Sequence, residues 1–307
     1  MDNQDAYWIA IDLLNIALSG VMLGGYYALI SIGLSLNFGV MRLVNLSHGD
    51  WLIIAAYMCS TLVATFAIYP FLTLIVVIPV MFVLGYFVQR ALLNHISLQA
   101  AEERGMSPVF ALMLPLLVTF GMSIVLSQGM LLVYSSDAAT IKNDLSYSGI
   151  KFSDDLSIST LKFIFFITAS LLLVALSLWL KNTHTGRAIR AASDDPETAT
   201  LMGIRTPHIY AIASGVSLAS AALAGFMVGM SRSFQPFDGV PFLLMAFGVV
   251  VVGGLGSLMG SLLGGVLLGV VQVFGGTYFG ASAQLVSGYL IILLALVLRP
   301  DGLLKKS

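Results

Sequence analysis

Long runs of hydrophobic residues, separated by short polar segments, are the main pattern of this 307-residue chain. A bilayer core needs about 20 apolar residues per helical pass, so each run free of Asp, Glu, Lys and Arg predicts membrane helices. The runs are residues 13–36, 51–89, 106–136, 163–180, 206–231 and 239–298. The second run has room for two helices with a turn at Pro70, and the last has room for three. The pattern predicts an all-α polytopic helical bundle with eight or nine membrane passes.

Composition supports a membrane protein without a soluble domain. Hydrophobic residues make up 58% of the chain and charged residues only 9%, whereas a soluble domain has about 25% charged residues. We therefore treat residues 1–307 as a single transmembrane domain. Cys59 is the only cysteine, which excludes an intrachain disulfide. The acidic start, MDNQDAYW, lacks the basic segment of a signal peptide and is expected to remain as an external tail.

The distribution of Lys and Arg predicts the orientation, because these residues concentrate in cytoplasmic loops. With nine passes and residues 181–208 inside, ten of the fourteen basic residues lie on the cytoplasmic side. The four on the opposite side are Lys142, Lys151, Lys162 and Arg232. The N-terminus is then external, residues 135–160 form an external loop, and the C-terminus is cytoplasmic.

The predicted membrane segments carry no sign of an energy source. Ion coupling usually requires an ionisable side chain in mid-membrane, but Asp50 and Arg90 lie at the ends of predicted segments. No Gly is followed directly by Lys, so the chain lacks a phosphate-binding loop and does not hydrolyse ATP alone. The histidines lack metalloprotease spacing, and no nucleophile and base can be paired. We therefore expect no enzyme, bound cofactor or metal, but a pore or a permease driven by another subunit.

Two polar patterns are candidates for a translocation path. Thr119, Ser123 and Ser127 recur every four residues on one helix face, with Gln128 nearby. They either line a substrate path or bond back to their own or a neighbouring helix. Residues 36–51 are too polar for lipid and too hydrophobic for a plain loop, which predicts a half-buried segment leading into the membrane. Its path candidates are Asn37, Asn45, Ser47 and His48.

Small residues near the C-terminus predict close helix packing. Gly256, Gly260 and Gly264 repeat at four-residue spacing, which lets two helix backbones approach closely. The GGLGS sequence at residues 253–257 can also break a helix where the backbone lines a cavity or is buried in protein. Both interpretations can hold together.

Charge gathers in residues 181–205, which hold seven of the 29 formal charges, whereas residues 239–298 hold none. Asp195 is a favourable helix N-cap, Pro196 suits the first helical position, and Gly203 suits the C-terminal end. The helix between them, 196–202, is about 10 Å long and cannot cross a membrane. It is either part of a solvated loop that follows the charge rule or a docking element for a cytoplasmic partner.

The sequence TGRAIRAASDDPETATLMGI, residues 185–204, resembles the coupling segment of permease subunits of branched-chain amino acid ABC importers. The matching positions are Gly186, Arg190, Ala191, Ala199, Gly203 and Ile204. Further matches follow in order: VNLSHGDWLIIAAY from residue 44, VTFGMSIVLSQG from 118, VVVGGLGSLMGSLLGG from 250 and LRPDGLL from 298. The sequence is similar to the shorter of the paired permeases in that family.

This resemblance implies a type II ABC-importer permease with broken or re-entrant helices in the bacterial inner membrane. Its partners would be two cytoplasmic ATPases that bind ATP and Mg²⁺, a second permease and a periplasmic solute-binding protein. The implied coupling residues are Gly186, Arg187, Arg190, Ala191, Asp195, Pro196, Ala199, Leu201 and Gly203. Arg187 and Arg190 would face ATPase carboxylates, while Ala199, Leu201 and Met202 would pack on the ATPase.

The implied cargo is a branched-chain or other hydrophobic amino acid. Two departures from the family pattern bear on it, because Ser47 replaces a frequent Ala and Asp50 a common Glu. Urea, short amides and aromatic acids are carried by close relatives and stay open as alternatives. A stand-alone channel for a small neutral solute also stays open, although it would not need a capped coupling helix. The sequence leaves a homodimer or a heterodimer open, and the family favours a second, different permease.

Overall fold

The computed structural model describes residues 3–96, 105, 108–143, 145, 149–153, 156–299 and 302–304. Within those residues, nine helices are long and apolar enough to span a membrane, the larger of the two predicted numbers. They are α1 (Asn3–Met41), α2 (His48–Phe66), α3 (Leu74–Ala91), α5 (Pro108–Tyr134), α6 (Thr160–Asn182), α9 (Thr206–Ser231), α10 (Gly239–Gly253), α11 (Leu258–Phe279) and α12 (Ala281–Leu298). The prediction of an all-α polytopic bundle is confirmed.

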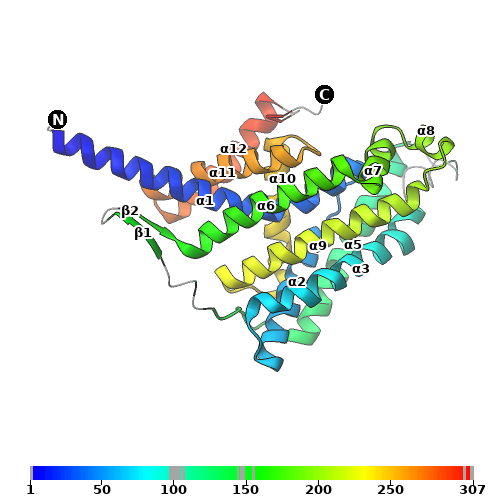
Figure 1. The fold of residues 1–307 in the computed structure, drawn as a ribbon, viewed down its shortest axis with the longest axis horizontal. Helices are drawn as coiled ribbons and strands as arrows, with labels where there is room; N and C mark the ends of the chain where they lie inside the picture. The colour runs from blue at the N-terminus through cyan, green and yellow to red at the C-terminus, as the bar shows by residue number, and fades with distance from the viewer. Residues whose placement is uncertain are drawn as a thin grey trace.

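Short elements mark the two ends of this bundle. They are the 3-10 turns η1 (Pro70–Thr73), η2 (Leu93–Ile96) and η4 (Pro236–Asp238), the helices α7 (His184–Asp194) and α8 (Pro196–Leu201), and the strands β1 (Gly149–Ser153) and β2 (Leu156–Ser159). The strands form an antiparallel hairpin within the predicted external loop. The hairpin and the start of α1 lie at one end, and α7 and α8 at the other (Figure 1). We name these the hairpin end and the α8 end.

Small residues bring the central helices together. α1 lies beside α6 and α11, while α9 packs against α1, α2 and α3 (Figure 1). A Cβ atom added at Gly20 would lie 2.5 Å from Val270 Cα, and one added at Gly265 would lie 2.6 Å from the Gly24 carbonyl oxygen. A Cβ at Gly85 of α3 would likewise lie 2.7 Å from the Ser214 carbonyl oxygen of α9. Close backbone approach replaces bulky side-chain packing here, as is usual between membrane helices.

Two helices, α2 and α10, begin inside the bundle. A Cβ at Gly33 of α1 would lie 3.0 Å from His48 Cε1. Gly33 precedes the end of α1 by eight residues, or about 12 Å at 1.5 Å per residue. Residues 42–47 therefore turn back into the bundle before α2 starts. The start of α10 meets the start of α2, since a Cβ at Gly49 would overlap the Gly239 carbonyl oxygen.

This geometry corrects one expectation from the sequence. The sequence suggested that Asp50 lies at the end of a membrane segment. In the structure it is 1% exposed and accepts a hydrogen bond from Ser123 Oγ at 2.5 Å. Ser123 is the eleventh residue of the 22-residue span 113–134, which puts both side chains near mid-span. The prediction that the membrane segments lack an interior ionisable group is wrong. It assumed that α2 begins at the membrane surface, whereas irregular backbone buried in protein lets it begin deeper.

Candidate functional site

The coupling segment starts with a sharp turn from α6 into α7. Thr183 caps α7, since its Oγ1 accepts a hydrogen bond from the Gly186 backbone N–H at 2.9 Å. A Cβ at Gly186 would lie 2.5 Å from Leu180 Cα, so a larger residue would push α7 away from α6. Gly186 therefore allows the two helices to join closely.

Asp195 caps α8, as the sequence predicted. Its Oδ1 accepts hydrogen bonds from the backbone N–H groups of Glu197 at 3.1 Å and Thr198 at 3.2 Å. The Thr198 hydroxyl donates to Oδ2 at 2.5 Å. These bonds, the Thr198 hydroxyl first among them, favour the ionised carboxylate and lower the pKa of Asp195. Pro196 occupies the first helical position, where its missing N–H costs no hydrogen bond.

The other end of α8 closes with a Schellman motif. The Ile204 N–H donates to the Ala199 carbonyl at 3.0 Å, and the Gly203 N–H donates to the Thr200 carbonyl at 3.0 Å. Gly203 has φ +84°, a conformation that favours glycine. The helix ends at Leu201, one residue earlier than predicted. A helix of six residues, marginal alone in water, is therefore closed at both ends.

The coupling candidates divide into buried and exposed side chains. Gly186 is buried, Ala191 and Pro196 are half-buried, and Arg187, Arg190, Asp195, Leu201 and Gly203 are exposed. Leu201 is 87% exposed and Met202 is 79% exposed. Ala199, expected to pack on a partner, is only 4% exposed and belongs to an apolar cluster of its own chain. That prediction is wrong for Ala199, because α8 turns this face toward the bundle.

The α7 and α8 pair is tied to the ends of α1 and α9. Ser193 Oγ donates to the Gly39 carbonyl of α1 at 2.5 Å, and Tyr210 OH of α9 donates to the Ala192 carbonyl at 3.3 Å. The apolar cluster that holds Ala199 also contains Val40 of α1 and residues of α7 and α9. A displacement of α8 would therefore move these helix ends, and α1 leads directly to the start of α2.

Several path candidates meet beside the start of α2. Asn45 Oδ1 accepts hydrogen bonds from the Ser47 N–H at 3.0 Å and from Ser47 Oγ at 2.7 Å, which fixes the turn before α2. Asn37, Asn45 and Thr119 line a small cavity of about 10 Å³ together with Gln89 of α3. Sequence reasoning did not single out Gln89, because no pattern along the chain places α3 next to this turn.

The predicted hydroxyl stripe on α5 serves different purposes along its length. Thr119 Oγ1 donates to the Pro115 carbonyl at 2.8 Å, and Ser127 Oγ donates to the Ile124 carbonyl at 3.1 Å, so both bond back to their own helix. Gln128 is exposed. Ser123 instead reaches across to Asp50, which the sequence analysis did not include among the path residues. The acidic residue within the polar segment 36–51 was the signal that could have identified it.

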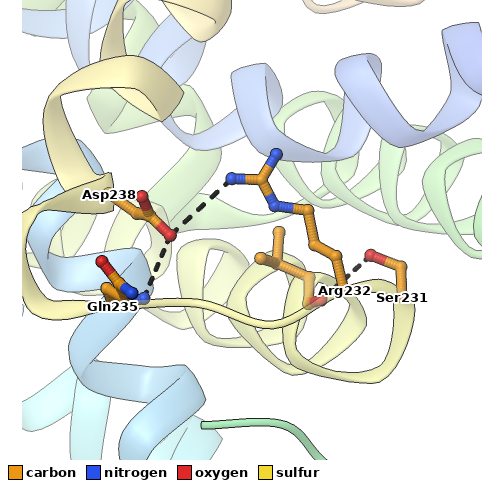
Figure 2. A network of polar contacts seen from close by, with 5 residues as sticks. Ser231, Arg232, Gln235 and Asp238 are labelled. Atoms are coloured by element: carbon orange, nitrogen blue, oxygen red, sulfur yellow. Dashed lines mark hydrogen bonds and ion pairs between the residues drawn. The ribbon is translucent and has the colours of Figure 1, made fainter. Parts of the chain in front are cut away.

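The chain enters α10 through an ordered turn. Figure 2 shows Arg232 directed toward Asp238, and their closest nitrogen and oxygen atoms are 3.7 Å apart. Asp238 also accepts a hydrogen bond from the Gln235 N–H at 3.0 Å. The Arg232 guanidinium lies 4.7 Å from the Phe242 ring centroid. These contacts hold the segment 232–238 in a defined turn that leads into the bundle, so it is not an unstructured connecting loop.

The glycines at residues 256, 260 and 264 lie where backbone segments of neighbouring helices approach closely. Gly256 has φ +80° in the turn between α10 and α11, and a Cβ there would lie 2.7 Å from Gly39 Cα. A Cβ at Gly264 would lie 2.5 Å from the Val249 carbonyl oxygen, and one at Gly260 would overlap the Gly253 carbonyl. These glycines bring α11 against α10 and the turn against α1. The break between α10 and α11 and the close helix packing thus occur in the same stretch of sequence.

Comparison with known proteins settles the family. The family model described as "Branched-chain amino acid transport system / permease component" matches residues 16–298. The chain belongs to this permease family. The permease is 30% identical over 294 residues to the high-affinity branched-chain amino acid transport system permease protein BraD of Pseudomonas aeruginosa, covering 93% of this chain and 94% of BraD. No solved structure matches it.

Two other relatives extend the comparison. The permease is 28% identical over 292 residues to LivH, a permease protein of the high-affinity branched-chain amino acid transport system of Escherichia coli, covering 93% of each chain. It is 31% identical over 147 residues to LivM, another such permease protein, from Salmonella typhimurium, covering 46% of this chain and 34% of LivM. These relatives are transport components rather than enzymes, and the nine apolar helices make this chain a multi-pass membrane permease.

Proposed function

We propose that this permease imports branched-chain and other hydrophobic amino acids across the bacterial inner membrane, driven by two separate cytoplasmic ATPase subunits. ATP and Mg²⁺ would bind on those subunits. A periplasmic solute-binding protein would deliver the substrate at the hairpin end, and the α8 end would face the cytoplasm. A second, different permease would complete the membrane pathway, which the partial similarity to LivM supports.

The observation that carries this proposal is the exposed tip of α8. Leu201 and Met202 are two large apolar side chains, 87% and 79% exposed, on a helix closed at both ends and attached to the bundle. Exposed apolar side chains on a rigid projection are typical of an anchor that fills a partner's pocket. Arg187 and Arg190, also exposed, would add favourable contacts with carboxylates around that pocket.

Coupling would then run from α8 into the bundle. Closure of the ATPase dimer would displace α8, and the contacts of α7 with Gly39 and Tyr210 would carry that displacement to α1 and α9. Because α1 continues through residues 42–47 into α2, the start of α2 would shift against α5 and α10. That shift would open the pathway alternately to the two sides of the membrane.

Replacing both Leu201 and Met202 with Asp tests this proposal in proteoliposomes that hold the complete transporter. The variant should keep the amount and size of the purified permease but lose leucine-stimulated ATP hydrolysis and ATP-dependent leucine uptake. A matched control, Leu201→Met with Met202→Leu, keeps the apolar surface and should behave like the original protein. Normal ATP-driven uptake by the Asp variant would refute a role for α8 as the anchor. ATP-independent uptake by the unaltered permease would instead favour a stand-alone channel.

A further inference from the structure

Asp50 stands out in the interior of the bundle. Of the Asp, Glu, Lys and Arg residues whose burial the structure describes, it is the only buried one, at 1% exposed. Ser123 donates to its Oδ2. Its other oxygen, Oδ1, has no hydrogen-bond partner among the described residues. A carboxylate with so few hydrogen bonds is energetically costly in mid-membrane, and an acidic residue kept there is therefore a candidate functional group.

Two spans fix the depth of this carboxylate. Ser123 is the eleventh of the 22 residues of its span on α5. His48, two residues before Asp50, lies beside Gly33 of α1, about 12 Å inside the end of that helix. Any solute that crosses between α2 and α5 would pass this level. Asp50 therefore lies about halfway along these spans, at a level that such a solute would have to pass.

A purely structural role explains Asp50 only in part. Its carboxylate contacts Gly239, the first residue of α10, and negative charge favours a helix N-terminus. However, a neutral Ser or Asn caps a helix about as well as Asp. Either residue would avoid the cost of a charge in the interior. The helix end therefore does not explain why the position carries an acid.

The seam between α2 and α5 also offers donors. Tyr57 OH, on the α2 face that carries Asp50, has no hydrogen-bond partner among the described residues. The Tyr57 ring stacks on Tyr134 of α5 with centroids 4.2 Å apart, and the Thr61 hydroxyl lies 3.3 Å from Tyr134 OH. The seam thus combines one carboxylate, several neutral donors and apolar surface. This combination suits a zwitterion with an apolar side chain.

We infer that Asp50 binds the α-ammonium group of the substrate as it passes the α2–α5 seam. This inference rests on the proposed function and narrows its cargo. The transported class is then α-amino acids with a free ammonium group and an apolar side chain. Urea, short amides and aromatic acids without an ammonium group would leave the carboxylate unpaired. The permease itself would reject them, in addition to any selection by the binding protein.

Competition for radiolabelled leucine on the purified permease and ATPase complex, without binding protein, tests this selectivity. Unlabelled leucine should displace the label, whereas 4-methylpentanoate, which has the same side chain and carboxylate but no ammonium group, should not. Asp50→Asn, nearly equal in volume, should lower leucine affinity at least about 30-fold and abolish the preference. Asp50→Glu should retain the preference. Thr168→Val on α6, whose hydroxyl bonds back to Ile164 of its own helix, is the control for substitution within a span.

The outcomes separate the inference from the proposed function. Equal displacement by leucine and 4-methylpentanoate on the unaltered complex would overturn the inference, and this measurement needs no variant. Wild-type leucine affinity and preference in Asp50→Asn would overturn it too. A purely structural role would lower the yield of Asp50→Asn but leave the preference of the assembled fraction intact, which again overturns it. Failure of the proposed function would appear differently, as absence of ATP-dependent leucine uptake by the unaltered transporter.

Discussion

Replacing Gly203 with Val tests the end of α8 without disturbing any packed surface. A Cβ atom at this position meets no heavy atom within 4 Å, so the substitution creates no clash. It acts through the backbone, because Gly203 has φ +84° and a β-branched residue is strongly disfavoured there. The cost is about 1–2 kcal/mol for an ordinary L-residue in this region. That corresponds to a roughly 5- to 30-fold shift of population away from the capped conformation.

Loss of the cap should uncouple the transporter while leaving the bundle intact. The six-residue α8 has little stability of its own, so losing the hydrogen bonds of Gly203 and Ile204 should fray the turn that carries Leu201. The assay is leucine-stimulated ATP hydrolysis by the reconstituted complex, with permease content measured in the same preparation. Gly203→Asn is the matched control, since Asn tolerates positive φ, and it should keep most of the activity. Undiminished stimulation in Gly203→Val, at normal permease content, would refute the reasoning.

Two further changes probe the cap and the helix crossing. The hydrogen bonds that lower the pKa of Asp195 stabilise α8 at neutral pH, and this contribution is lost as pH falls through that lowered pKa. Hydrogen exchange of residues 196–204 should therefore accelerate, relative to the intrinsic rate, only below about pH 4, the ordinary range of an Asp carboxyl. Asp195→Asn should remove this pH dependence, and its persistence would contradict the assignment. Gly49→Ala should greatly reduce the yield of monodisperse permease in size-exclusion chromatography, because its Cβ would overlap the Gly239 carbonyl. Gly121→Ala on α5, where a Cβ meets nothing within 4 Å, should leave the yield unchanged, and equal yields for both variants would contradict the close crossing.

Local signals in the sequence were sufficient to predict the membrane spans and the short helix α8. Runs free of charge predicted eight or nine passes, because a membrane helix satisfies its own backbone and needs only apolar length. Asp195, Pro196 and Gly203 predicted α8 since caps depend on residues within one turn. The burial of Ala199 against its own bundle could not be predicted in the same way. A short helix with apolar residues on both sides does not reveal which side faces the bundle.

The interior start of α2 depended on contacts between distant residues. Counting apolar residues assumes that helices begin at the membrane surface, so the polar residues 36–51 suggested a half-buried segment leading into the membrane, with Asp50 at the end of a span. The actual depth is set by the meeting of Gly49 with Gly239 and of His48 with Gly33, which no spacing along the chain encodes. The stripe of Thr119, Ser123 and Ser127 was visible, but its one contact with Asp50 required the packing of α5 on α2.

The most direct test of the account is to purify the permease from its native membrane in mild detergent and identify the proteins that remain bound. The account predicts that ATPase subunits co-purify with it. They should be lost when the sequence of residues 195–203 is scrambled, while the permease itself remains in the membrane. A homo-oligomer without an ATPase, from an extraction that preserves a known importer complex in the same membrane, would contradict the central claim that α8 joins this permease to an ATP-hydrolysing partner.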